Sequence, residues 1–284
     1  MNLLPINNYS QFKILYQSVN NNIQKLDTNC LLPGKVLRDS IRDNSLYYRE
    51  FPEGLILYVD EGNLYKIYYF LDNSKPFPDL RCGKNVMIEE LDSNNRRQDY
   101  LNYFSRKIYQ AGFSLESKNI QFEINLTEQK QWILSEYEKA AKRLNTNGLL
   151  ATVKPDNAQV KQILEIWKLY LKQTDVPISH TKFLTDIEQS VVCILNKNAS
   201  VCGTLWWIFR GNYCEIRHIV THPDYYRMGI SNYTMLFSFM KALEGNSKSV
   251  ISYTDIQNEK SILMHRRAGM KENGKISMQF LLEA

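Results

Sequence analysis

The segment Glu215–Leu236, EIRHIVTHPDYYRMGISNYTML, constrains the fold more than any other stretch of the chain. Its first part, up to Thr221, reads as a strand, and the apolar residues from Ile230 onward recur at a helical period. A short loop containing Gly229 joins the two. The unpaired N–H groups and the dipole of such a helix N-terminus favour an anion such as pyrophosphate. Gly229 allows a close approach of the backbone to that ligand, and Arg227 adds positive charge.

The chain after residue 148 alternates strand and helix patterns, an order typical of an α/β domain. The expected strands are Leu149–Val153, Val191–Leu195, Ser200–Phe209, Tyr213–Thr221, Ser249–Thr254 and Ile276–Leu282. The expected helices are Ala158–Leu171, Thr181–Gln189, Ile230–Leu243 and Glu259–Arg267.

The first part of the chain has its own set of elements. Strands are expected at Ser45–Phe51, Leu55–Val59, Leu64–Leu71, Asn85–Leu91 and Asn119–Leu126. Helices are expected at Arg96–Ala111 and Gln129–Arg143. Because the turn residues Asn145–Gly148 interrupt the pattern, we place the domain boundary there and predict domains 1–146 and 147–284.

Two segments of the chain resemble one another. Arg106–Phe122 reads RKIYQAGFSLESKNIQF, and Met264–Phe280 reads MHRRAGMKENGKISMQF. In both, Ala-Gly follows a helix and precedes a strand that contains Gln-Phe. Either the likeness is chance or the chain holds two related domains in tandem, and we favour the second interpretation.

The loop Tyr226–Ser231 (YRMGIS), with Asn258 and Ala268–Met270 downstream, resembles the CoA-binding motif and C-terminal end of the GNAT superfamily of N-acyltransferases. The resemblance runs from about residue 149 to the C-terminus. It implies an α/β GNAT fold, with a mixed central sheet flanked by helices and acyl-CoA held between the fourth and fifth strands. The N-terminal domain would be a second, degenerate GNAT-like domain.

The resemblance also implies a cosubstrate, acetyl-CoA or another acyl-CoA, and no metal. The backbone of Ile219 would polarise the thioester carbonyl, and that of Thr221 would hold the pantetheine arm. Asn258 would contact this arm or stabilise the turn from strand to helix. The amides that would bind the pyrophosphate belong to Arg227, Met228, Gly229, Ile230, Ser231 and Asn232.

Two side chains are candidates for proton transfer during direct attack of an amine in a ternary complex. Glu215 lies eleven positions before Tyr226, and the glutamate base of histone-type members of the family has the same spacing from the start of the CoA-binding loop. Alternatively, Glu215 could form a salt bridge with Arg217. Strand alternation would put Glu215, Arg217 and Ile219 on one face. His265 stands where the family commonly has a tyrosine acid, and the alternative is an exposed helical histidine.

The acceptor would be a small-molecule or peptide amine. Trp206, Trp207, Tyr213 and the loop Asp175–His180 would border it, although adjacent tryptophans point to opposite faces of a strand, so at least one belongs to a core. The first domain has no glycine in Asp92–Arg97, the segment after its strand Asn85–Leu91. We therefore expect it to bind no CoA.

Composition narrows the alternatives. The net charge is +5, from 35 basic and 30 acidic residues, and there is no basic stripe, so nucleic acid is not an expected partner. The apolar runs are too short for a membrane span. Five cysteines without a CxxC pair, and an N-terminus unlike a signal peptide, indicate a cytoplasmic protein. An aminoacyl-tRNA-dependent transferase of the Fem type and a non-catalytic acyl-CoA-binding protein remain alternatives.

Overall fold

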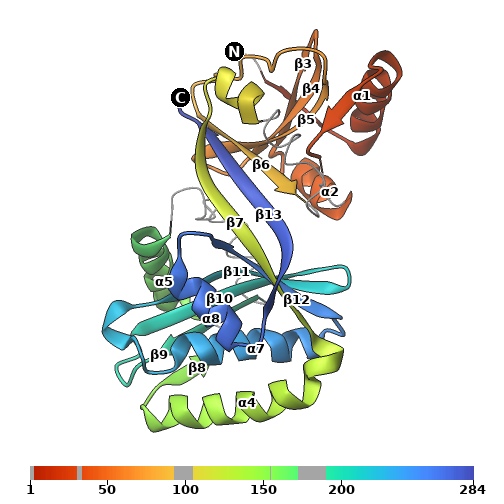
Figure 1. The fold of residues 1–284 in the computed structure, drawn as a ribbon. Helices are drawn as coiled ribbons and strands as arrows, with labels where there is room; N and C mark the ends of the chain where they lie inside the picture. The colour runs from red at the N-terminus through yellow and green to blue at the C-terminus, as the bar shows by residue number, and fades with distance from the viewer. Residues whose placement is uncertain (1–2, 31–33, 93–104, 154, 172–189) are drawn as a thin grey trace. The chain divides into compact units, whose positions relative to one another are not determined.

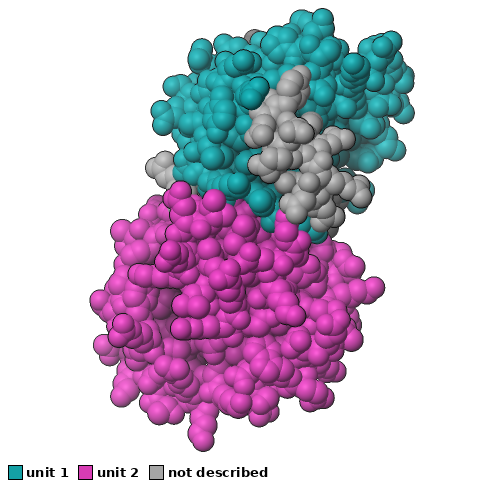
Figure 2. Space-filling model, viewed as in Figure 1, with its two compact units in different colours: residues 1–118, 275–284 teal, residues 119–274 magenta. Residues whose placement is uncertain are grey.

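The computed structural model describes residues 3–30, 34–92, 105–153, 155–171 and 190–284 (Figure 1). The chain forms two compact units, residues 1–118 with 275–284 and residues 119–274, which Figure 2 colours separately. We call them unit 1 and unit 2. No described helix has both the length and the apolar character needed to cross a bilayer.

Unit 2 is built on a mixed sheet in the order β7-β12-β11-β10-β9-β8. Among its described strands, only β11 and β12 pair in parallel. The strands are β8 Leu150–Thr152, β9 Val191–Leu195, β10 Val201–Arg210, β11 Tyr213–Thr221 and β12 Ser249–Asp255, with residues 119–125 of β7. The helices are α4 Leu126–Thr146, α5 Asn157–Tyr170, α7 Ile230–Glu244 and α8 Glu259–Arg267.

Two apolar cores, one on each face of this sheet, fix the helices of unit 2. Residues of α4 and α7 share one core with Ile216 of β11. Trp167 of α5 lies in the other core, with Trp206 of β10. The helix α5 starts as the sequence indicates, because Asp156 and Gln159 form a capping box.

Unit 1 has a sheet in the order β1-β3-β4-β5-β6-β13, and β2 also pairs with β5. In the part of unit 1 that the structure describes, only β5 and β6 pair in parallel. The strands are β1 Leu4–Pro5, β2 Leu26–Thr28, β3 Leu46–Phe51, β4 Gly54–Asp60, β5 Leu64–Asp72 and β6 Asn85–Asp92, with residues 276–282 of β13. The helices are α1 Tyr9–Asn22 and α2 Gly34–Arg42, and residues 105–110 are also helical.

The two similar segments of the sequence take equivalent places in the two units. Each contains a glycine of positive φ, Gly112 or Gly269, followed by a strand of 12 residues, β7 Ser114–Asn125 or β13 Lys271–Leu282. Each strand then pairs antiparallel with the second member of a parallel pair, β12 or β6. The interpretation as two related units in tandem therefore holds for the fold.

Each of these two strands pairs with the sheet that contains the other repeat's parallel strand pair. The strand β7, from the N-terminal repeat, pairs with β12 of unit 2, and β13, from the C-terminal repeat, pairs with β6 of unit 1. The helix α4 also packs against α7, with the rings of Tyr137 and Tyr233 stacked 5.5 Å apart. The compact units consequently differ from the predicted division at residues 146 and 147: residues 119–146 lie in unit 2 and residues 275–284 in unit 1.

Most predicted elements appear within a few residues of their expected bounds, and Tyr213–Thr221 and Glu259–Arg267 match their strand and helix at both ends. The strands β7 and β13 each begin five residues before the predicted start. The helix Thr181–Gln189, the loop Asp175–His180 and most of the helix Arg96–Ala111 lie outside the described residues.

Candidate functional site

The parallel strands β11 and β12 of unit 2 are paired along only part of their length. Their ladder runs from Tyr213 opposite Ser249 to Ile216 opposite Ser252. Beyond it β11 stays paired with β10 up to Thr221, and β12 stays paired with β7. The two strands therefore part after Ile216, and beyond this point no described strand pairs with that edge of β11.

The N–H groups of Ile219 and Thr221 face this open edge. His222 donates its backbone N–H to the carbonyl of Cys202, in β10, at 2.8 Å. Because N–H groups alternate in direction along an antiparallel strand, those of Ile219 and Thr221 point away from β10. Both predicted residues thus present backbone donors past the end of the ladder, where an extended ligand with amide and carbonyl groups can pair with the strand.

A bulge marks the point where the strands part. Trp206 lies opposite His218 and Trp207 opposite Ile216, so Arg217 is the extra residue on β11. Alternation is broken there: Ile219 packs against the core of α7, whereas Arg217 lies over the ring of Trp206 in the core of α5. The prediction that Glu215, Arg217 and Ile219 share one face is therefore wrong for Ile219.

The loop between β11 and α7 has the backbone of an anion-binding loop. A short 3₁₀ turn, Pro223–Tyr225, leads to Arg227 and Gly229, whose φ angles are +68° and +88°. A backbone that alternates between left-handed and right-handed conformations turns successive N–H groups to one side, where they can bind an anion. Gly229 is the N-cap of α7 and has no side chain with which to cap the first turn. The helix N-terminus is thus available to a ligand.

Three further hydrogen bonds connect this loop and the residues beside it to their surroundings. Ser231, which replaces the small glycine or alanine of the GNAT motif, shares a 2.9 Å hydrogen bond with the hydroxyl of Thr221. From α4, Arg143 donates to the carbonyl of Arg227 at 2.8 Å, and Asn147 donates to the carbonyl of Met228 at 2.9 Å. Sequence reasoning missed Arg143 and Asn147, which precede the loop by about eighty residues.

Glu215 is buried and paired with two arginines. Its carboxylate oxygens accept from Arg210 Nε and Arg217 Nη1, each at 2.6 Å. Burial opposes ionisation, but the two arginines outweigh it and hold the pKa of Glu215 below its usual value. A carboxylate of low basicity with both oxygens occupied is poorly suited to accept a proton, so the geometry favours the salt-bridge alternative.

His265 is buried rather than exposed. Its Nδ1 lies 2.7 Å from the carbonyl oxygen of Ser261, and its Nε2 lies 2.9 Å from Ser252 Oγ. Since a carbonyl can only accept, Nδ1 carries the proton and Nε2 accepts from the Ser252 hydroxyl. Burial lowers the pKa of His265 and the bond to Ser261 opposes this less strongly, so the ring is neutral near pH 7. In this state Nε2 has no proton to give a leaving thiolate.

The adjacent tryptophans take opposite faces of β10, as predicted. Trp207 lies in the core of α7, 5.7 Å from the ring of Phe237. Trp206 stacks on Trp167 at 5.9 Å and is 5.4 Å from His218, on the face where Arg217 lies. Trp206 and His218 therefore border the parting of the strands from the α5 side.

Comparison with known proteins identifies the fold. No protein-family model and no curated protein matches the chain. Among solved structures, a tandem GNAT protein from the clavulanic acid biosynthesis pathway is similar over 99% of this chain and 98% of its own, with a TM-score of 0.60 and 10% identity. A GCN5-related N-acetyltransferase from Sphaerobacter thermophilus is similar over 86% of this chain and 84% of its own, with a TM-score of 0.52 and 10% identity.

The chain has a tandem GNAT fold. A Drosophila protein with a TM-score of 0.54 and 9% identity also spans 99% of the chain and 98% of its own length. In this fold the parting of β11 and β12 and the N-terminus of α7 lie where the sequence places the acyl-CoA site. Asn258 is the N-cap of α8 and accepts from Ser261 N at 3.0 Å, so of its two predicted roles it performs at least the stabilisation of the turn.

The GNAT-like unit 1 has the same parting of strands, but its own chain occupies it. The β5–β6 ladder runs only from Leu64 opposite Asn85 to Ile67 opposite Ile88, and β2 pairs with β5 beyond that point. The counterpart of β11 is thus β5. The sequence analysis instead compared the loop after β11 with Asp92–Arg97, which follows β6, and this choice of strand was wrong. Residues 93–97 lie outside the described residues.

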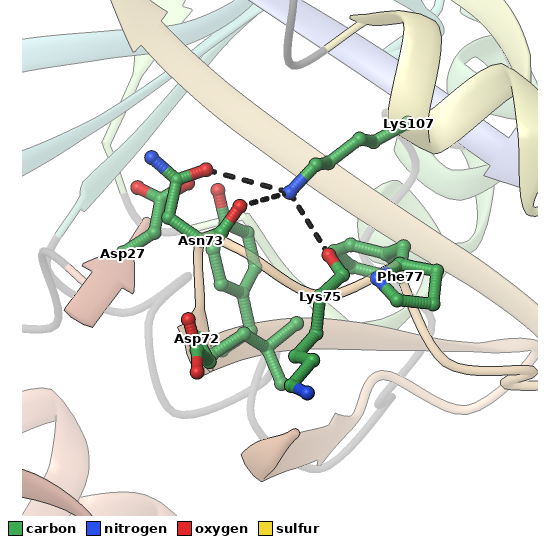
Figure 3. Close-up of a pocket in the computed structure, with 9 residues that line it drawn as sticks. Asp27, Asp72, Asn73, Lys75, Phe77 and Lys107 are labelled. Carbon is green, nitrogen blue, oxygen red and sulfur yellow. Dashed lines mark hydrogen bonds between the residues drawn. The ribbon is translucent and has the colours of Figure 1, made fainter. Parts of the chain in front are cut away.

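The segment that follows β5 differs from the loop and helix that follow β11. Residues 73–84, all of them described, connect β5 to β6 without a helix. The ammonium group of Lys107 holds this connection by donating to the carbonyls of Asn73 and Lys75 in the small pocket of Figure 3. Unit 1 therefore has no helix N-terminus at the position where α7 starts in unit 2.

Proposed function

We propose that the chain is an acyl-CoA-dependent N-acyltransferase whose reaction takes place in unit 2. The observation that carries the proposal is the direction of the Ile219 and Thr221 amides, which face the parting of β11 and β12 beyond the last ladder pair. The same strand leads directly into the loop and the uncapped start of α7. One continuous backbone surface thus offers donors for a thioester, an amide-containing arm and a pyrophosphate.

The chemistry proposed is direct acyl transfer, most simply of acetyl. The nitrogen of a primary amine attacks the thioester carbonyl, the C–N bond forms and the C–S bond breaks, and CoA leaves as the thiolate. The Ile219 N–H stabilises the negative charge that develops on the carbonyl oxygen. The attacking nitrogen loses one proton, and the thiolate takes up one from the protein or water.

The contacts of Glu215 and His265 support structural roles more than the proposed roles of base and acid. We therefore assign the main catalytic effect to binding and orientation on the strand amides. A small-molecule or peptide amine is the proposed acceptor, and the cytoplasm the proposed compartment. A non-catalytic acyl-CoA-binding protein is the second candidate, because both predicted proton-transfer groups are engaged within the protein.

Calorimetric titration of CoA and acetyl-CoA into the full chain tests the proposal. Gly229→Glu is expected to abolish micromolar binding, since a side chain at φ +88° is strained and would come within 3.2 Å of Arg143. Gly211→Glu is the matched control: its φ is +58° and nothing lies within 4 Å of the added Cβ. Absence of binding to the wild type would overturn the proposal. Release of free CoA thiol from acetyl-CoA in the presence of a panel of amines would distinguish an enzyme from a protein that only binds acyl-CoA.

A further inference from the structure

The C-terminal end of α4 contacts three successive residues of the loop before α7. Arg143 donates to the carbonyl of Arg227, and Asn147 donates to the carbonyl of Met228. The Arg143 stem also packs on Gly229, where an added Cβ would lie 3.2 Å from Arg143 Cδ. The helix α4 lies outside the segment formed by β11, the loop and α7. It is thus hydrogen-bonded to the loop where Arg227 and Gly229 have positive φ angles.

These bonds determine the direction of the loop amides. A trans peptide group is planar, with its carbonyl and the following N–H on opposite sides. When Asn147 holds the carbonyl of Met228 toward α4, the N–H of Gly229 must point away from α4. Likewise, Arg143 holds the carbonyl of Arg227 and turns the N–H of Met228 away, where it makes only a 3.4 Å contact with Tyr225 O.

The helix that carries these side chains is firmly attached to unit 2. Ala140 and Leu144 of α4 are buried in the core shared with α7, and the hydroxyls of Tyr137 and Tyr233 are 3.2 Å apart. Arg143 and Asn147 themselves are exposed. Their removal would free the loop carbonyls without opening the core, so loop order and the stability of unit 2 can be separated by experiment.

We infer that Arg143 and Asn147 are positioning residues that hold residues 227–229 in the conformation that binds the pyrophosphate of CoA. The inference rests on the proposed function. Without the two donors, the positive φ of Arg227 costs free energy with no compensating contact, and the loop samples conformations whose amides diverge. Affinity for ligands with a pyrophosphate therefore depends on α4.

The test compares acetyl-CoA with S-acetylpantetheine, which has the thioester and the amide arm but no pyrophosphate. Arg143→Ala and Asn147→Ala are each expected to weaken CoA binding about 5- to 20-fold, the range of one hydrogen bond to a charge-binding loop. Turnover of S-acetylpantetheine should change less than about twofold, because this ligand has no pyrophosphate to bond with the loop amides. Lys139→Ala removes one positive charge from the same exposed helix surface. It should leave both the affinity for CoA and the turnover of S-acetylpantetheine unchanged.

Arg143→Gln separates hydrogen bonding from charge, because a glutamine amide can still donate to the Arg227 carbonyl; it is expected to recover part of the CoA affinity. Unchanged CoA affinity in both alanine variants, or an equal loss for S-acetylpantetheine, would overturn the inference while the proposed function stands. Failure of the wild type to bind CoA would overturn both.

Discussion

The backbone N–H of Tyr69 donates a 2.8 Å hydrogen bond to the side-chain oxygen of Asn29, beyond the end of the β5–β6 ladder. The amide nitrogen of Asn29 donates in turn to the carbonyls of Ile67 and Glu89, one on each strand, at 3.3 Å. A single buried side chain thus bonds three backbone groups at the point where the strands of unit 1 part.

From this arrangement we expect one acyl-CoA per chain, bound in unit 2. Asn29→Ala would remove a hydrogen bond from three backbone groups, at a cost of about 1–3 kcal/mol for each group that finds no other donor, acceptor or water. The variant should therefore unfold at lower urea concentration than the wild type but keep the same stoichiometry and affinity in calorimetry. A second binding event in either protein would contradict the assignment.

Glu215 provides a test of how the amine loses its proton. Because the pKa of Glu215 is lowered below its usual value, the carboxylate stays ionised throughout an assay range of pH 5 to 9. The pH profile of kcat/KM should then have no limb that Glu215→Gln removes, although the variant loses two ion pairs and stability. Disappearance of an acid limb near pH 6 to 7 in Glu215→Gln would instead establish Glu215 as the base.

His265 is expected to make stability depend on pH in a defined window. Its pKa is lowered in the folded state, so below the unfolded value of 6.5 the unfolded chain binds the extra proton first. The contribution of His265 to stability should be constant above pH 6.5 and fall as the pH drops toward the folded pKa, by at most about 1.4 kcal/mol per pH unit. His265→Gln keeps a donor and an acceptor but does not titrate. Parallel urea-unfolding curves for the two proteins from pH 5 to 8 would refute the expectation.

Local signals were sufficient for the strand, loop and helix around Gly229 and for the tandem repeat. A strand pattern ending at Thr221, a glycine that must adopt positive φ and a helical apolar period all lie within about twenty residues. The bulge at Arg217 has only a faint signal, because alternation of polar and apolar residues breaks where Arg217 and His218 follow one another. It is produced by the pairing of β11 with β10, and it changed which side chains share a face.

The rest depended on contacts between distant segments. The helix Gln129–Arg143 was visible as a helix, but nothing in its sequence shows that its end binds the loop at Arg227. The helix α1 was missed although Tyr9, Phe12 and Val19 recur at helical spacing and pack on the core of unit 1, because Asn and Gln fill much of the remaining sequence. The exchange of β7 and β13 could not be predicted, because each strand pairs with a segment more than a hundred residues away and no local pattern indicates that partner.

Glu90 in unit 1 gives an opposite pH dependence that can be tested separately. Burial raises its pKa to about 8, and a 2.8 Å hydrogen bond from Tyr69 Oη only partly opposes this. The folded state therefore holds a proton that the unfolded chain releases above about pH 4.5, so stability is fully present below that pH and is lost as the pH rises toward 8. Glu90→Gln keeps an acceptor for Tyr69 and removes the titration, so its melting temperature relative to wild type should increase steadily between pH 5 and 8. A constant difference across this range would show that Glu90 is ionised in the fold.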